Sequence, residues 1–135
     1  MSGPVDQDPV DPELVELAGR VFDAARSGDA PALAAYVDAG APPDLCNERG
    51  DSLVMLAAYH GHADAVRTLL ERGADANRIN DRGQTPLAGA VFKGADAVVE
   101  TLLAGGADPH AGQPSAALTA EMFGKTELVK RFAAY

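Results

Sequence analysis

The sequence predicts an all-α solenoid of about four helix-turn-helix units that are joined by short hairpin loops. The first observation is a repeat, because glycines recur at intervals of 33 residues, as at Gly28, Gly61 and Gly94. The second is that apolar residues such as Val66 and Leu69 keep this register and have helical spacing. A single helix pair cannot bury its own apolar stripe, so neighbouring units must stack to form a core.

The repeat divides the chain into four units after an N-terminal tail. We expect a disordered, acidic and Pro-rich tail at residues 1–12, and units at residues 13–46, 47–79, 80–112 and 113–135. The first unit opens with a longer helix that begins near Glu13. The last unit is three residues short, most simply in the loop around Asp108–Gln113. Atypical end units are expected in a solenoid because their outer faces contact water.

Within a unit, the first helix is expected at about Ser52–His60 and again at Thr85–Lys93. Thr85 is a good N-cap residue, and Pro86 follows at the first helical position, where a missing N–H costs nothing. A glycine follows each of these helices, where a left-handed residue is needed. The pattern therefore predicts one short helix, a tight turn and a second helix in each unit.

Four short motifs resemble the ankyrin repeat. They are G-x-T-P-L at Gly83–Leu87, G-A-D-x-N at Gly73–Asn77, and the pairs Gly61-His62 and Leu69-Leu70. The family signature has a histidine where this sequence has Ala88, and the end units are degenerate copies. The resemblance implies a non-enzymatic scaffold that binds a protein partner through a concave face of hairpin tips and first helices.

The 33-residue period selects ten candidate partner-binding residues on that face. They are Arg49, Asp51, Tyr59, His60, Asp81, Arg82, Gln84, Phe92, Lys93 and Met122. Tyr59, Phe92 and Met122 share one register in successive units, and an apolar stripe within a charged rim has the composition of an interaction hot spot. The alternatives are that Phe92 and Phe123 pack between units as core, and that the charged tips are a solvated rim without a partner.

Composition limits the class of partner. The net charge is −9, which opposes binding to nucleic-acid phosphates and favours a basic protein partner. The N-terminus has no pattern of a signal peptide, and the apolar runs are too short to span a bilayer. With one cysteine, no internal disulfide can form. We expect no membrane association, a cytoplasmic location and a bacterial source, the last from the Ala-, Asp- and Arg-rich composition.

The sequence shows no catalytic arrangement. His60 and His62 suggest a metal site, but no further histidine or cysteine ligand lies at suitable spacing, and His62 resembles the structural histidine of the family. Cys46 has no catalytic histidine arrangement beside it, and its position near a hairpin suits a small apolar residue. We therefore expect no enzyme activity, no cofactor and no metal.

Two other functions stay open at this point. A monomer is expected, but the short last unit, with Phe123, Phe132 and Tyr135, could leave an uncapped apolar edge through which the chain self-associates. A metal protein or enzyme that uses His60 and His62 is the third hypothesis.

Overall fold

The structure, a computed structural model, describes residues 11–135, which form eight helices and no extended strand. The helices are α1 (Pro12–Ser27), α2 (Ala30–Asp38), α3 (Leu53–Tyr59), α4 (Ala63–Glu71), α5 (Pro86–Lys93), α6 (Asp96–Ala104), α7 (Ala116–Met122) and α8 (Thr126–Ala133). The predicted all-α class is confirmed. Residues 1–10 of the expected tail lie outside the described residues.

The boundary of that tail differs slightly from the prediction. Pro12 is the first residue of α1, and the Asp11 side chain accepts a hydrogen bond of 2.9 Å from the Glu13 amide as its N-cap. Aspartate is a favoured N-cap and proline a favoured first helical residue, so these two residues begin the helix. The observed helix start thus lies one residue before the predicted start near Glu13.

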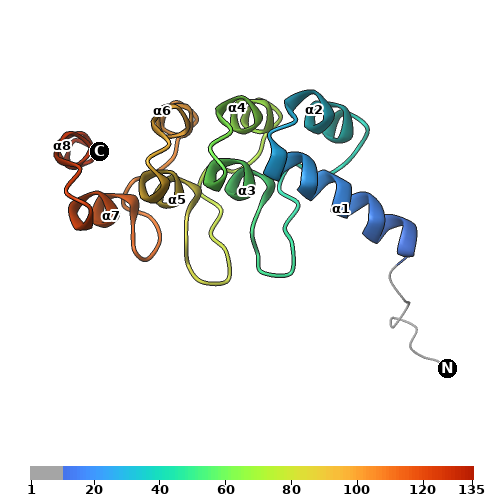
Figure 1. Ribbon diagram of the computed structural model, residues 1–135, viewed down its shortest axis with the longest axis horizontal. Helices are drawn as coiled ribbons and strands as arrows, with labels where there is room; N and C mark the ends of the chain where they lie inside the picture. The colour runs from blue at the N-terminus through green and yellow to red at the C-terminus, as the bar shows by residue number, and fades with distance from the viewer. Residues whose placement is uncertain (1–10) are drawn as a thin grey trace.

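The helices form two parallel rows along a solenoid (Figure 1). One row holds α1, α3, α5 and α7, and each contacts the next along the row. The other row holds α2, α4, α6 and α8, and the loops that join successive units all leave the same side of the stack. The longer α1 projects beyond α2 at the N-terminal end.

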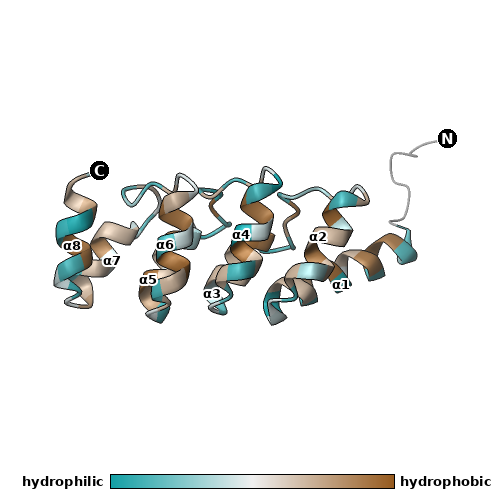
Figure 2. Cartoon of the chain, turned by 90° about the horizontal axis from the view of Figure 1, so that it is seen from above, coloured by the Kyte–Doolittle hydropathy of each residue, from teal (hydrophilic) through white to brown (hydrophobic). Residues whose placement is uncertain are grey.

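The core lies between the two rows. Leu33, Leu69 and Leu102 of the second helices are fully buried, and so are Leu53 and Leu87 of the first helices. The connecting loops are mostly hydrophilic (Figure 2). Every unit therefore contributes apolar side chains to one continuous core, as the repeat pattern predicts.

The ends of the short first helices follow the predicted chemistry. The hydroxyls of Ser52, Thr85 and Ser115 each accept a hydrogen bond of 3.0–3.1 Å from the amide three residues later. Gly61 and Gly94 follow helices α3 and α5 with φ of +82° and +71°, a region that L side chains rarely adopt. The N-cap role of Thr85 is confirmed.

The last unit is shortened at its hairpin. Isolated bridges pair Cys46 with Ser52 in one hairpin and Gly112 with Ser115 in the last one. Three fewer residues thus separate the bridged pair in the last hairpin, at the edge of the segment predicted to carry the deletion. The last hairpin is therefore shorter than the hairpin that Cys46 and Ser52 close.

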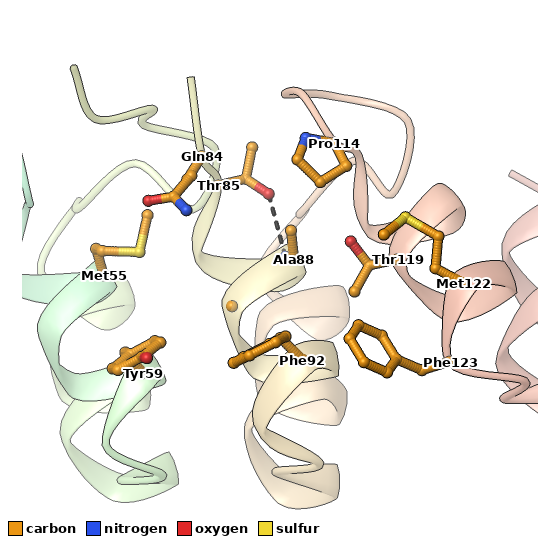
Figure 3. Close-up of a pocket in the computed structure, with 11 residues that line it drawn as sticks. Met55, Tyr59, Gln84, Thr85, Ala88, Phe92, Pro114, Thr119, Met122 and Phe123 are labelled. Carbon is orange, nitrogen blue, oxygen red and sulfur yellow. Dashed lines mark hydrogen bonds between the residues drawn. The ribbon is translucent and has the colours of Figure 1, made fainter. Parts of the chain in front are cut away.

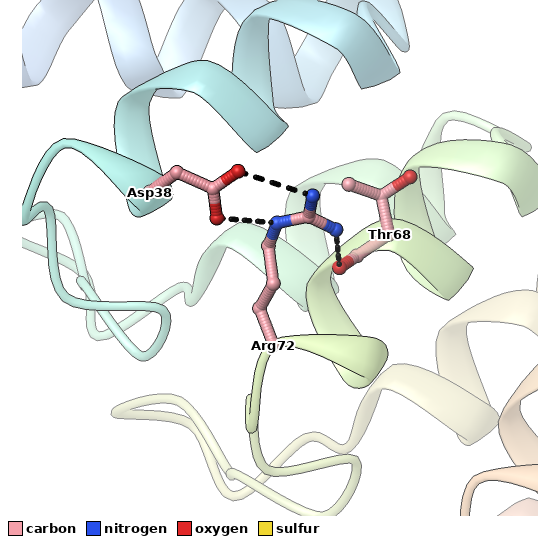
Figure 4. A network of polar contacts seen from close by, with 3 residues as sticks. All are labelled: Asp38, Thr68 and Arg72. Atoms are coloured by element: carbon pink, nitrogen blue, oxygen red, sulfur yellow. Dashed lines mark hydrogen bonds and ion pairs between the residues drawn. The ribbon is translucent and has the colours of Figure 1, made fainter.

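Two arginines join the second helices of neighbouring units. Arg72 donates two hydrogen bonds to the Asp38 carboxylate, at 3.0 and 3.3 Å, and one to the carbonyl oxygen of Thr68 (Figure 4). Arg131 makes an equivalent two-bond contact with the carboxylate of Glu100. These bonds raise the pKa of both guanidinium groups and lower the pKa of the Glu100 carboxyl.

Two histidines also link units. His62 lies at the start of α4, and its Nε2 donates a hydrogen bond of 2.8 Å to the carbonyl oxygen of Arg26 in the preceding unit. His110 makes a similar bond of 3.0 Å to the carbonyl oxygen of Phe132. The structural role expected for His62 therefore agrees with its contacts. Phe132 itself is fully buried, so its expected place on an exposed apolar edge was wrong.

Candidate partner-binding groove

A groove with a volume of about 360 Å³ crosses the row of first helices (Figure 3). Four of the ten predicted residues line it, namely Tyr59, Gln84, Phe92 and Met122. They come from helices α3, α5 and α7 and from the hairpin before α5. The common register of Tyr59, Phe92 and Met122 places these side chains in one groove because successive first helices lie side by side.

The apolar side chains of the groove remain open to solvent. Tyr59 is 41% exposed, Phe92 54%, Met122 62% and Phe123 50%. The alternative in which Phe92 and Phe123 form inter-unit core is therefore wrong. Large apolar side chains that stay exposed together in one groove are typical of interaction surfaces, because exposure of apolar surface to water is unfavourable until a partner covers it.

Tyr59 is held at the edge of the groove by two neighbours. The Lys93 amine lies 4.8 Å from the centroid of the Tyr59 ring, as a cation–π contact from the next unit. The His60 ring meets the same tyrosine edge-on, with ring centroids 5.7 Å apart. His60 and Lys93 are thus at the border of the groove, beside its lining.

Sequence reasoning missed part of the lining. The further lining residues are Met55, Thr85, Ala88, Gly89, Pro114, Thr119 and Phe123, of which only Phe123 was considered. Met55 and Ala88 precede Tyr59 and Phe92 by four residues, which places them on the same helix face one turn earlier. That spacing was the available signal. Pro114 offered none, because it lies in the irregular loop of the shortened unit.

The other predicted residues occupy the hairpin tips. Arg49, Asp81 and Arg82 are exposed there and are not part of the groove lining. Asp51 is half-buried, and its carboxylate accepts a hydrogen bond of 2.8 Å from the Asn80 side chain. The Asp51 carboxylate therefore stabilises the packing of two neighbouring hairpins.

The histidines and the cysteine that were considered as metal-binding or catalytic residues make structural contacts. Among residues 11–135, no three His, Cys, Asp or Glu side chains converge in a way that could hold a metal ion. The His62 ring stacks on His60 with centroids 6.5 Å apart while its Nε2 bonds to a carbonyl group. Cys46 donates a weak hydrogen bond to the carbonyl oxygen of Asp44.

Residues 21–113 match the family model described as ankyrin repeats in three copies. The chain belongs to the ankyrin-repeat family. Members of this family are generally protein–protein interaction modules and are typically not enzymes. The matched residues include the hairpins and the first and second helices of the central ankyrin units, so the family match and the observed solenoid agree.

Two ankyrin relatives extend this comparison. The chain is 48% identical, over 50 residues, to an ankyrin repeat protein of Pseudomonas aeruginosa, which covers 37% of this chain and 29% of that protein. The crystal structure of the human ASB11 ankyrin repeat domain is similar with a TM-score of 0.72 and 30% identity. That match covers 84% of this chain and 52% of the ASB11 chain. The chain thus spans about half the ASB11 domain and under a third of the Pseudomonas protein.

None of the helices described within residues 11–135 is long and apolar enough to cross a membrane.

Proposed function

We propose that this ankyrin-repeat chain binds a protein partner through the groove and its hairpin rim. The observation that carries the proposal is the line of exposed side chains Tyr59, Phe92 and Met122, contributed by three successive units. Aromatic residues and methionine are enriched where interfaces are most strongly buried. An open groove of this kind suits the surface of a protein better than a small substrate, which usually needs an enclosed pocket.

The charged residues around the groove form the rest of the proposed interface. Arg49, Asp81 and Arg82 lie on the hairpin side, and His60 and Lys93 lie at the ends of the first helices. Residues of both signs at the rim favour specificity and correct orientation. The net charge of −9 adds a long-range attraction for a partner of positive net charge, which salt weakens. We place this interaction in the cytoplasm of a bacterium, a proposal supported by the Pseudomonas relative and the single cysteine.

An affinity capture with matched variants tests the proposal. Lysate of the source cell is passed over the wild-type chain, over a Tyr59→Ala, Phe92→Ala variant, and over a Leu14→Ala, Tyr135→Ala control. The control also removes two exposed apolar side chains, but they lie outside the groove. A protein that the wild type and the control retain, and the groove variant loses, supports the proposal. Equal retention by all three contradicts it.

Self-association is the second candidate, favoured by the exposed Leu118, Phe123 and Tyr135 of the last unit. Sedimentation at increasing protein concentration separates the two. A constant monomer mass supports partner binding alone. A mass that rises with concentration, and falls back in a Leu118→Ala, Tyr135→Ala variant, supports assembly through the last unit.

A further inference from the structure

Within residues 11–135, two glycines occur inside helices at positions where the backbone does not require them. Gly19 lies in α1 and Gly89 in α5, and neither has a positive φ. Glycine weakens a helix relative to alanine because it has more conformational freedom to lose. Neither position needs glycine for its backbone conformation, so alanine should be tolerated at both.

Gly89 lies at the floor of the groove. A Cβ built there would lie 3.6 Å from Cδ1 of Tyr59 and 3.9 Å from the sulfur of Met55, which are ordinary van der Waals distances. An alanine would therefore fit without strain, and packing of the stack does not demand glycine. The absence of a side chain at Gly89 leaves an open space beside Tyr59 and Met55, which a methyl group would occupy.

The glycine at the floor of the groove belongs to the unit of residues 80–112 and does not recur in the two adjacent units. The same register holds Leu56 in the preceding unit and Thr119 in the following one, so both neighbouring helices present a side chain there. Phe92, three residues after Gly89 on α5, is exposed and lines the same groove. The result is a notch, defined here by Gly89, Met55, Tyr59 and Phe92, rather than a channel along the whole stack.

The charge beside the notch is positive. The Lys93 amine lies over the Tyr59 ring, and the Lys125 amine lies near Gly94 at the end of α5. Within residues 11–135, neither amine is within ion-pair distance of a carboxylate. This edge is locally cationic although the chain as a whole carries a charge of −9. A carboxylate is the group that complements it.

We propose that the notch at Gly89 receives one apolar side chain of the partner, and that Lys93 pairs with a carboxylate next to that side chain. The occupant is thus a protein segment with an apolar anchor residue flanked by an acidic residue. This inference rests on the proposed function and adds to it the chemistry that the groove selects.

The test uses a displayed library of random linear peptides, selected on the wild-type chain. Affinities of the selected peptides are measured for the wild type and for Gly89→Ala, Lys93→Gln, Gly19→Ala and Phe92→Ala variants. We expect the selected sequences to share an apolar residue beside Asp or Glu. Gly89→Ala should weaken their binding by about tenfold or more, because one extra methyl group then fills the notch. Lys93→Gln should weaken binding at low salt and less at high salt.

The stability of the variants separates loss of the notch from loss of the fold. Gly89→Ala and Gly19→Ala should each raise the melting temperature by about 3 °C through helix propensity. Of these two glycine variants, only Gly89→Ala should lose peptide affinity, so Gly19→Ala is its matched control. If the peptides bind wild type and Gly89→Ala equally but lose binding to Phe92→Ala, the proposal that the notch receives a side chain is wrong. The proposal that the groove binds a partner would still stand. Peptides insensitive to Phe92→Ala, or a selection that yields none, contradict the proposed function itself.

Discussion

Phe92 and Phe123 meet edge to face across two successive units, with ring centroids 5.4 Å apart and an interplanar angle of 75°. Each of the two residues still has about half of its surface exposed. The pair therefore orders the groove wall without being part of the buried core. Tyr59 is ordered in a comparable way by Lys93, again from the neighbouring unit.

The exposure of Phe92 predicts a small effect on stability. We expect Phe92→Ala to lower the free energy of unfolding by about 1 kcal/mol, because the aromatic pair is lost but little buried area is. Chemical denaturation monitored by circular dichroism measures this change. A loss as large as that of a core leucine would show that Phe92 belongs to the core.

The buried leucines of the second helices predict a large effect. Leu69→Ala and Leu102→Ala should each lower the free energy of unfolding by about 2–5 kcal/mol, because both side chains are fully buried and a cavity would remain. The same denaturation experiment checks the values, with Ile79→Ala as an exposed aliphatic control. A difference of less than about 1 kcal/mol between core and control variants would contradict the packing.

The close approach of Gly28 to His62 predicts coupling between these residues. A Cβ at Gly28 would lie 2.5 Å from the His62 ring, and the φ of +77° is also unfavourable for alanine. Gly28→Ala should therefore destabilise the chain strongly. His62→Ala alone should cost about 1 kcal/mol through the lost hydrogen bond to Arg26.

A double-mutant cycle tests that coupling. The Gly28→Ala, His62→Ala variant should be more stable than the sum of the two single effects predicts, because the clash is absent. The strain of the positive φ should persist. Additive effects would mean that His62 moves away from Gly28 at no cost.

The Glu100–Arg131 pair predicts a dependence of stability on pH. The hydrogen bond from Arg131 lowers the pKa of the Glu100 carboxyl in the folded chain. Its stabilisation is therefore complete above the unfolded-state pKa of about 4.3, and it is lost as pH falls through the lower folded-state pKa. Glu100→Gln should lower the melting temperature slightly at neutral pH, since the pair is exposed.

Melting curves from neutral to strongly acidic pH check this prediction. The difference between wild type and Glu100→Gln should disappear at the acidic end. Glu48→Gln, which changes a carboxylate at an exposed hairpin tip with no ion pair among residues 11–135, is the matched control. A constant difference for Glu100→Gln at every pH would exclude the ion pair as its cause.

The histidine contacts predict that metal has no effect on stability. The Nε2 of His62 is bonded to a carbonyl group, and residues 11–135 offer no group of three ligands around it. Zinc or a chelator should leave the melting temperature unchanged in scanning fluorimetry. A zinc-dependent rise that His60→Ala removes would support the metal hypothesis instead.

The local pattern was sufficient to predict most of the fold. Capping at Thr85, the left-handed Gly94 and the helical spacing of Leu69 depend on residues close in the sequence, and the structure agrees with all three. Stacking followed from the repeat, since units with the same apolar register bury the same face. The groove positions Tyr59, Phe92 and Met122 followed from the same register. The first helix begins at Pro12, one residue before the predicted start, and the N-cap Asp11 followed by proline is the local signal for that start.

By itself, the sequence determined the class of solenoid, the two helices of each unit and the apolar register, because these depend on local propensity and on a fixed period. Only the tertiary structure decided which apolar residues stay exposed. Phe92 and Phe132 are both aromatic residues of short helices, yet Phe92 is half exposed and Phe132 is fully buried. The open floor at Gly89 likewise depends on side chains 30 or more residues away, and their distance is set only when the units stack.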